Sequence, residues 1–307
     1  MNTLIKRSLI PIITLLLIQT AGIGQKVDLT NSLNASKLKT AGDTLIKKTE
    51  FGANLNQGSF SSNWSGGGVN SVALGLFFNA LREKKKGKNS WRNDFQSQYG
   101  VVRNKGQQSR KNVDRIYFDS KYNRELAKQW SLFANVNFLS QFAPGYEYSQ
   151  NPDSTGFKKK VSGFFAPAFL TEAIGIEYKP VPYFFIDFAP GALRQTFVTD
   201  ESIRIGKPSN YGVDYKKKVR NEVGIIQLVA NFDKDIAKDI NLKFRYLLYT
   251  TYESKQFNFD HRLDAMITAK IAKYFNVNLG AIVVYDKDQA SKAQFAQGLS
   301  VGFLYSL

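Results

Sequence analysis

Apolar and polar side chains alternate along much of the chain after residue 48, with the period of two that is typical of β-strands. The segment 299–307, at the end of the sequence, is the clearest case. One face of this segment is small and polar except at Leu304. The other face is apolar and consists of Leu299, Val301, Phe303, Tyr305 and Leu307. A strand with such a face needs a layer of lipid or protein to cover it.

The alternation divides the chain into twelve predicted strands, which tight turns and longer polar loops connect in turn. The predicted strands are 49–55, 68–82, 90–102, 112–123, 129–142, 161–179, 183–198, 217–232, 240–254, 258–271, 276–286 and 295–307. The tight turns lie at 84–88, 125–128, 179–182, 233–239 and 272–275, and the longer loops at 56–67, 104–111, 143–160, 200–216 and 287–293, with a short exception near Lys255. Outer-membrane β-barrels show this alternation, with short periplasmic turns and longer extracellular loops.

The pattern therefore predicts an all-β fold, a transmembrane outer-membrane β-barrel of about 12 antiparallel strands. Aromatic residues support it, because they gather beside the turns (Trp91, Trp130, Tyr183, Phe184, Phe232, Tyr274 and Phe275) and beside the loops (Tyr99, Phe142, Tyr146, Phe197 and Tyr252). The alternative is a soluble β-sandwich, which would have shorter strands and no regular alternation of short and long connections. A count of 10 or 14 strands stays open.

The N-terminal segment has the features of a secretory signal. Lys6 and Arg7 precede an almost wholly apolar run over residues 8–20, and small residues follow before Gln25. The run is short for a membrane-spanning helix, which is the alternative interpretation. We predict a cleaved signal peptide over 1–24, a periplasmic tail over 25–48 and a barrel over 49–307, located in the outer membrane of a Gram-negative bacterium.

The chain is strongly basic, with a formal net charge of +17, and loss of Lys6 and Arg7 with the signal leaves +15. Such a charge indicates polyanionic partners. An exported protein meets lipopolysaccharide phosphates rather than nucleic acid. Runs of basic residues on or beside the predicted extracellular loops are candidate lipopolysaccharide contacts, and a solvated basic rim is the alternative. They are Lys158, Lys159, Lys160, Lys216, Lys217, Lys218 and Arg220.

The polar face of each strand predicts the wall of the lumen. The candidate lumen residues are Arg92, Asp94, Asp187, Lys243, Arg245, Arg262, Asp264 and Lys270. Basic residues outnumber acidic ones in this set, so an open pore would favour anions. Ion pairs such as one between Arg245 and Asp264, or a plug formed by the tail, would instead close it. The strands at 112–123 and 217–232 do not separate cleanly into two faces.

Candidate catalytic chemistry is sparse. The single histidine, His261, is expected on the outer face near the loops, but no serine follows two positions later, as in outer-membrane phospholipases, and no GxSxG elbow exists. Asp233, Asp235 and Asp239 lack the glycine and the closing acid of a calcium loop and are interpreted as turn residues. The absence of cysteine excludes disulfides, thiolate metal sites and cysteine nucleophiles. We predict no enzyme, no metal site and no cofactor.

Several short blocks together resemble an exported family of the Bacteroidetes that is known only as a domain of unknown function. The resemblance extends from Trp64 to Pro190 and continues more weakly to Leu307. The blocks are Trp64–Gly68, Trp91–Asn93, Gln98–Gly100, Asp114–Tyr122, Gln141–Tyr146, Ser162–Pro167 and Phe188–Pro190. The resemblance implies no catalytic residue and no ligand. The glycines and prolines of these blocks are also the residues that sharp bends between strands and loops require.

Three functions stay open on the sequence. A narrow passive channel with anion preference is favoured, a non-enzymatic accessory subunit of an outer-membrane assembly, export or uptake complex is the alternative, and a phospholipase-like hydrolase is a distant third. The expected partners are outer-membrane lipid, lipopolysaccharide, other envelope proteins and the barrel-insertion machinery. That machinery recognises a terminal strand like the one at 299–307.

Overall fold

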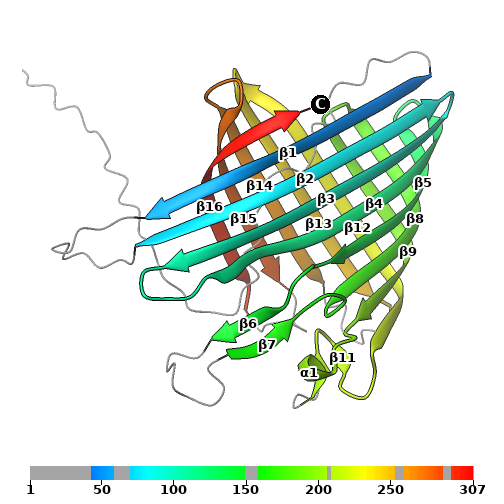
Figure 1. Cartoon of the computed structure of the whole chain (residues 1–307). Coiled ribbons are helices and arrows are strands. Elements are labelled where there is room, and N and C mark those ends of the chain that lie inside the picture. Colours follow the sequence, from blue (N-terminus) through cyan, green and yellow to red (C-terminus); the bar gives the residue numbers. More distant parts are fainter. Residues whose placement is uncertain are drawn as a thin grey trace, which may run out of the picture.

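The computed structural model describes residues 43–58, 70–148, 158–205, 209–252, 259–285 and 292–306. These residues form a closed barrel of twelve antiparallel strands (Figure 1), which confirms the predicted fold class. The barrel strands are β1 (Thr44–Gly58), β2 (Ser71–Lys86), β3 (Asn89–Asn104), β4 (Arg110–Ala127), β5 (Trp130–Ser140), β8 (Ala168–Val181), β9 (Phe184–Phe197), β12 (Val219–Ala237), β13 (Ile240–Thr251), β14 (Asp260–Lys270), β15 (Phe275–Tyr285) and β16 (Gln294–Ser306). Each strand pairs with its neighbour along the chain, and β16 pairs with β1 to close the ring.

The two rims of the barrel differ in their connections, as the sequence predicts. Five hairpins on one rim have turns of two to four residues, at 87–88, 128–129, 182–183, 238–239 and 271–274. Gly87 and Asp239 adopt φ values of 55° and 59° there, the left-handed conformation that two-residue hairpin turns require. The opposite rim carries the longer connections, seen at the bottom of Figure 1. We name them the periplasmic rim and the extracellular rim, following the usual orientation of outer-membrane barrels.

The outer surface of the barrel is apolar over most of its circumference. Leu76 on β2 and Leu299 on β16 are 56% and 62% exposed, and Phe303 and Tyr305 continue the same face of β16. Trp130 and Tyr178 lie with ring centroids 4.5 Å apart near the periplasmic rim, in an aromatic belt. Soluble monomers do not expose so large an apolar surface. The barrel therefore presents its outer face to lipid, as bacterial outer-membrane barrels do.

Several predicted boundaries are wrong. β2 runs on to Lys86 and β4 to Ala127, so the turns predicted at 84–88 and 125–128 are shortened to 87–88 and 128–129. β1 begins at Thr44, so residues 44–48 pair with β2 and are not part of a tail. The segment 161–179 is two strands, because the chain turns at 163–167 between β7 (Lys158–Ser162) and β8. β12 runs on to Ala237, so Asp233 and Asp235 are strand residues and only Asp239 lies in the turn. Residues 1–42 lie outside the described part, so the signal peptide and the tail before residue 43 stay predictions.

Two of the loops fold together into a small layer outside the barrel, which we call the cap, comprising 141–148, 158–167, 198–205 and 209–218. It contains β6 (Gly145–Tyr148), β7, α1 (Glu201–Arg204), β10 (Ser209–Asn210) and β11 (Val213–Asp214). Ala166, Val198, Ile203 and Val213 form its core and are at most 4% exposed. Within the described chain, no helix is long and apolar enough to span a membrane.

Candidate functional site: a polar network across the lumen

The inner face of the barrel is polar and densely packed. Asp94 and Gln96 on β3 are each 2% exposed, and Gln98 is buried beside them. A Cβ at Gly302 on β16 would lie 2.5 Å from Asn276 Oδ1, so a larger residue there would displace the neighbouring amide. Small and medium polar residues line the lumen on β15 and β16. Longer charged side chains project from other strands, such as Lys48 on β1 and Arg92 on β3.

The structure places all eight sequence-predicted lumen residues on the inner face. Three of the five basic residues among them make ion pairs. Arg262 donates to Asp264 at 2.8 Å through both Nε and Nη2. Lys243 Nζ lies 3.0 Å from Asp233 Oδ2, and Arg92 Nη2 lies 3.9 Å from Asp94 Oδ2. Arg245 is the register partner of Asp264, whereas Lys270 is exposed at the periplasmic rim.

Lys121 on β4 forms the most enclosed ion-pair cluster of the lumen. Its ammonium group lies 2.7 Å from Glu177 Oε2 on β8 and 2.6 Å from Asp187 Oδ1 on β9. The rings of Phe133 and Phe185 flank the ammonium, with centroids 4.8 Å away. Asn123 also donates to Glu177. All three charges are thus paired within a site that contains apolar walls.

Sequence reasoning missed Lys121, Arg115, Asp119, Glu177 and Asp233. The first three belong to the strand predicted at 112–123, whose two faces were not separated. In the structure Asp119 pairs in register with Asp94, so odd-numbered residues of β4 face the lumen up to Lys121. That parity was present in the sequence. It was obscured because Tyr117, an aromatic residue, shares the inner face with the charged residues.

Side chains also connect strands that are not neighbours in the ring. Lys121 on β4 reaches past β5 to Glu177 on β8 and Asp187 on β9. Arg194 Nη1 on β9 donates to the hydroxyl of Tyr249 on β13. Arg115 Nη1 donates to Gln96 on the neighbouring β3 at 3.0 Å. Hydrogen bonds and ion pairs inside the lumen therefore join strands that do not pair with each other.

The predicted lipopolysaccharide contacts lie on or beside the cap, and some are already engaged. Lys160 pairs with Asp200, and Arg220 pairs with Glu222 at 3.0 Å. Hydrogen bonds from Lys160 and Ser202 lower the pKa of Asp200 below its ordinary value, so this ion pair persists in mildly acidic solution. The ammonium of Lys158 lies 4.0 Å from the centroid of the Tyr146 ring. Lys159, Lys216, Lys217 and Lys218 are exposed.

His261 lies on the outer face, as predicted. Its Nδ1 is 2.8 Å from the hydroxyl of Tyr246, and the ring of Tyr285 is its other neighbour. Asn241 donates to both Asp233 and Asp235, so these carboxylates serve the strand pairing of β12 with β13. Among the described residues no group of three or more histidine, aspartate or glutamate side chains is arranged to hold a metal ion.

Comparison with known proteins assigns no activity to the chain. Residues 55–146 match the family described as "Protein of unknown function (DUF3078)", which confirms the resemblance to a family of unknown function over that segment. No curated protein matches the sequence.

Solved structures resemble the chain only in architecture. The chain is similar to the translocator domain of the autotransporter NalP from Neisseria meningitidis, at 11% identity and a TM-score of 0.34, over 87% of this chain and 90% of that one. It is also similar to the NanC porin (8% identity, TM-score 0.40, 83% and 98% covered). A third similar structure is the COG4313 outer membrane channel from Pseudomonas putida F1. Its sequence identity is 8% and its TM-score 0.38, and the match covers 90% of this chain and 98% of that one.

Proposed function

We propose that this protein is a non-enzymatic outer-membrane barrel whose lumen is closed at rest, and that it acts as a membrane-embedded subunit presenting its folded cap to other envelope proteins. The observation that carries the proposal is the ion pairing of Lys121 on β4 with Glu177 on β8 and Asp187 on β9, which joins strands that are not neighbours in the ring. Separating charged groups that are paired and packed in a confined lumen costs free energy, because each charge then loses its partner. Pairing therefore favours the closed state.

Ion conductance tests closure directly. The purified protein in a planar lipid bilayer is expected to give no steady unitary current. The double variant Arg115→Ala with Arg245→Ala removes two charged side chains of the inner face, while Asp264 keeps Arg262 as its partner, and it is expected to conduct. Arg124→Ala is the matched control, because Arg124 lies on the outer face of the same strand, and it should stay silent.

A narrow passive channel with anion preference is the second candidate function. It is favoured by the basic residues of the cap, which would concentrate anions at the mouth of an open pore. Steady current through the unmodified protein, with a reversal potential that indicates anion selectivity, would establish the channel and contradict the closed barrel. Lys243→Glu and Arg245→Glu should then reduce that selectivity.

We also propose that the exposed lysines of the cap bind lipopolysaccharide phosphates in the outer leaflet. Replacing Lys158, Lys159, Lys216, Lys217 and Lys218 by serine is expected to reduce the lipopolysaccharide that copurifies with the barrel several-fold, because exposed ammonium groups bind phosphate mainly through charge. Mass spectrometry of the extracted lipid measures this. Replacement of Lys84, Lys86 and Lys88 at the opposite rim is the control. Equal retention in all variants would mean that the cap lysines are only solvated.

A further inference from the structure

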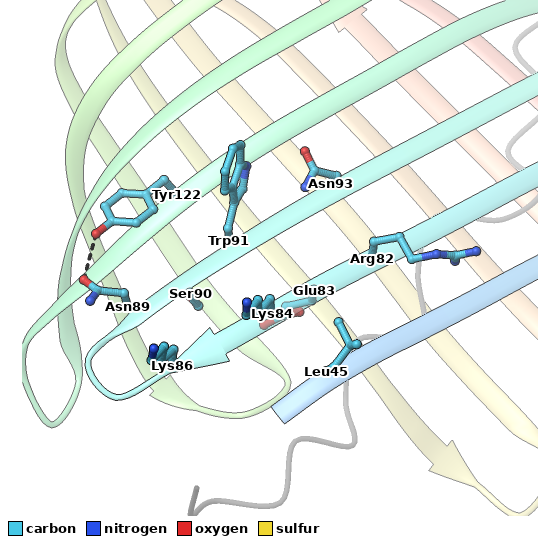
Figure 2. A pocket seen from close by; sticks show the side chains of 10 residues that line it. All are labelled: Leu45, Arg82, Glu83, Lys84, Lys86, Asn89, Ser90, Trp91, Asn93 and Tyr122. Carbon is cyan, nitrogen blue, oxygen red and sulfur yellow. Dashed lines mark hydrogen bonds between the residues drawn. The ribbon is translucent and has the colours of Figure 1, made fainter. Parts of the chain in front are cut away.

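A groove of about 320 Å³ lies on the outer face of the barrel near the periplasmic rim, across β1 to β4 (Figure 2). Trp91 on β3 and Tyr122 on β4 form its aromatic wall, and Leu45 on β1 lies at its other edge. The indole is 57% exposed. The groove is thus open to the membrane and is not part of the lumen.

Hydrogen bonds within the protein hold the two aromatic rings in place. Trp91 Nε1 donates to Ser120 Oγ at 2.9 Å, and that hydroxyl donates in turn to Asn93 Oδ1 at 2.9 Å. The hydroxyl of Tyr122 donates to Asn89 Oδ1 at 2.7 Å. The polar atoms of the rings are therefore satisfied by the protein. Their apolar surfaces remain available to a hydrocarbon chain.

Three cations of β2 line the groove: Arg82, Lys84 and Lys86. Figure 2 shows that the Arg82 side chain points away from Trp91 and from the two lysines. Its Nη1 donates to Lys48 O and to Leu81 O, both at 2.8 Å, and its Nη2 donates to Thr49 Oγ1 at 2.9 Å. Lys84 and Lys86 are therefore the cations that are available to a ligand.

The charge of the groove is positive. Glu83, the acidic residue beside it, is the register partner of Arg92 and so shares the inner parity of the barrel wall. Asp43, whose Oδ1 accepts a hydrogen bond from Gly87 N at 3.2 Å, lies at the adjacent turn. The three cations of β2 still outnumber these two acids, so the net charge beside the groove is positive.

The position of the groove along β2 indicates its depth in the membrane. Leu74, Leu76 and Phe78 occupy the same outer face as Arg82 and Lys84 and are all exposed. The apolar band thus ends where the cations begin, at the level of the lipid headgroups. Anionic headgroups are attracted to clustered basic residues at this depth, and aromatic rings favour the same interface.

We propose that this groove binds an anionic glycerophospholipid of the periplasmic leaflet. Lys84 and Lys86 attract its phosphate, and an acyl chain lies against Trp91 and Tyr122. The binding is independent of whether the lumen conducts. It also differs from lipopolysaccharide binding at the cap, because the two sites lie at opposite rims of the barrel.

Native mass spectrometry of the full-length protein in detergent micelles tests the site. Titration with dioleoylphosphatidylglycerol is expected to fill one tight site, and zwitterionic dioleoylphosphatidylcholine should bind at least about tenfold more weakly. Each basic residue near a lipid surface contributes about fivefold in affinity, so Lys84→Gln with Lys86→Gln should weaken phosphatidylglycerol binding about 25-fold. Both side chains are exposed, so the barrel should still fold.

Lys128→Gln with Lys238→Gln is the matched control, since both lysines are exposed in other turns of the same rim. It removes the same charge and should keep the affinity within about twofold. Trp91→Ala provides a second measurement, because it should weaken binding without changing the charge. Equal affinity for the two lipids, or equal losses in the groove and control variants, would overturn the proposal. Loss of lipopolysaccharide binding in the groove variant would overturn the assignment to the periplasmic leaflet.

Discussion

Deletion of Phe303–Leu307 is expected to abolish stable insertion of the barrel. β16 closes the ring through register pairs from Glu50–Ser306 to Leu55–Val301, and the deletion removes those of Phe303, Leu304, Tyr305 and Ser306. It also removes the bond from Leu304 N to Tyr274 O. An open sheet edge cannot satisfy its backbone groups in lipid. The measurement is the heat-modifiable, folded band in outer-membrane fractions, which should disappear.

A point substitution on the same strand should act in the same direction but less strongly. Phe303 packs against Tyr274 and Phe275 on the outer face, with centroids 5.8 Å away in both cases. Phe303→Asp places a carboxylate on the lipid-facing surface. Its cost in folding free energy should be below the roughly 2–4 kcal/mol that Arg or Lys costs at the middle of the bilayer. Ser300→Ala on the inner face is the control and should insert normally. Normal insertion of the truncated chain would refute the role of this strand.

Lys121→Met is expected to lower the free energy of unfolding by about 3–5 kcal/mol, because it leaves two enclosed carboxylates without their cation. Glu177 and Asp187 face the same ammonium from neighbouring strands, so they would also repel each other. Urea unfolding of the barrel in lipid vesicles, followed by tryptophan fluorescence, measures the change.

Two further variants separate the ion-pair cluster from general effects of losing a lysine. Lys121→Met combined with Glu177→Gln and Asp187→Asn removes every charge of the cluster and should recover most of the stability. Lys270→Met removes an exposed lysine of the inner face and should change stability by no more than about 0.5 kcal/mol. A loss below about 1 kcal/mol for Lys121→Met would mean that water replaces the ion pairs at little cost.

The barrel could be predicted from the sequence because lipid and lumen impose opposite polarities on alternate residues. The register failed where the alternation is interrupted. Pairing shifts between Gly100 and Val101 against β4, and again near Ile225 against β9, so a single parity does not describe these strands. Such β-bulges leave no reliable mark in the hydrophobic pattern.

The network across the lumen could be predicted only in part. Arg245 and Asp264 lie on consecutive strands, so their shared inward parity was visible in the sequence. The ion pairs of Lys121 with Glu177 and Asp187 depend on how the sheet curves as twelve strands close into a ring, because β5 lies between β4 and β8. The cap core likewise joins Ala166 to Val198 and Val213 without any periodic pattern. These contacts are set by tertiary closure and not by local alternation.

The central claim is that the closed sheet spans the outer membrane with its tight turns in the periplasm. Because the chain contains no cysteine, single cysteines can be labelled without background. Glu147→Cys in the cap should react with a membrane-impermeant maleimide on intact cells. Lys238→Cys, in the turn between β12 and β13, should react only after the outer membrane is permeabilised. Labelling of Lys238→Cys and protection of Glu147→Cys on intact cells would contradict the orientation, and labelling of both would contradict the barrel in the membrane.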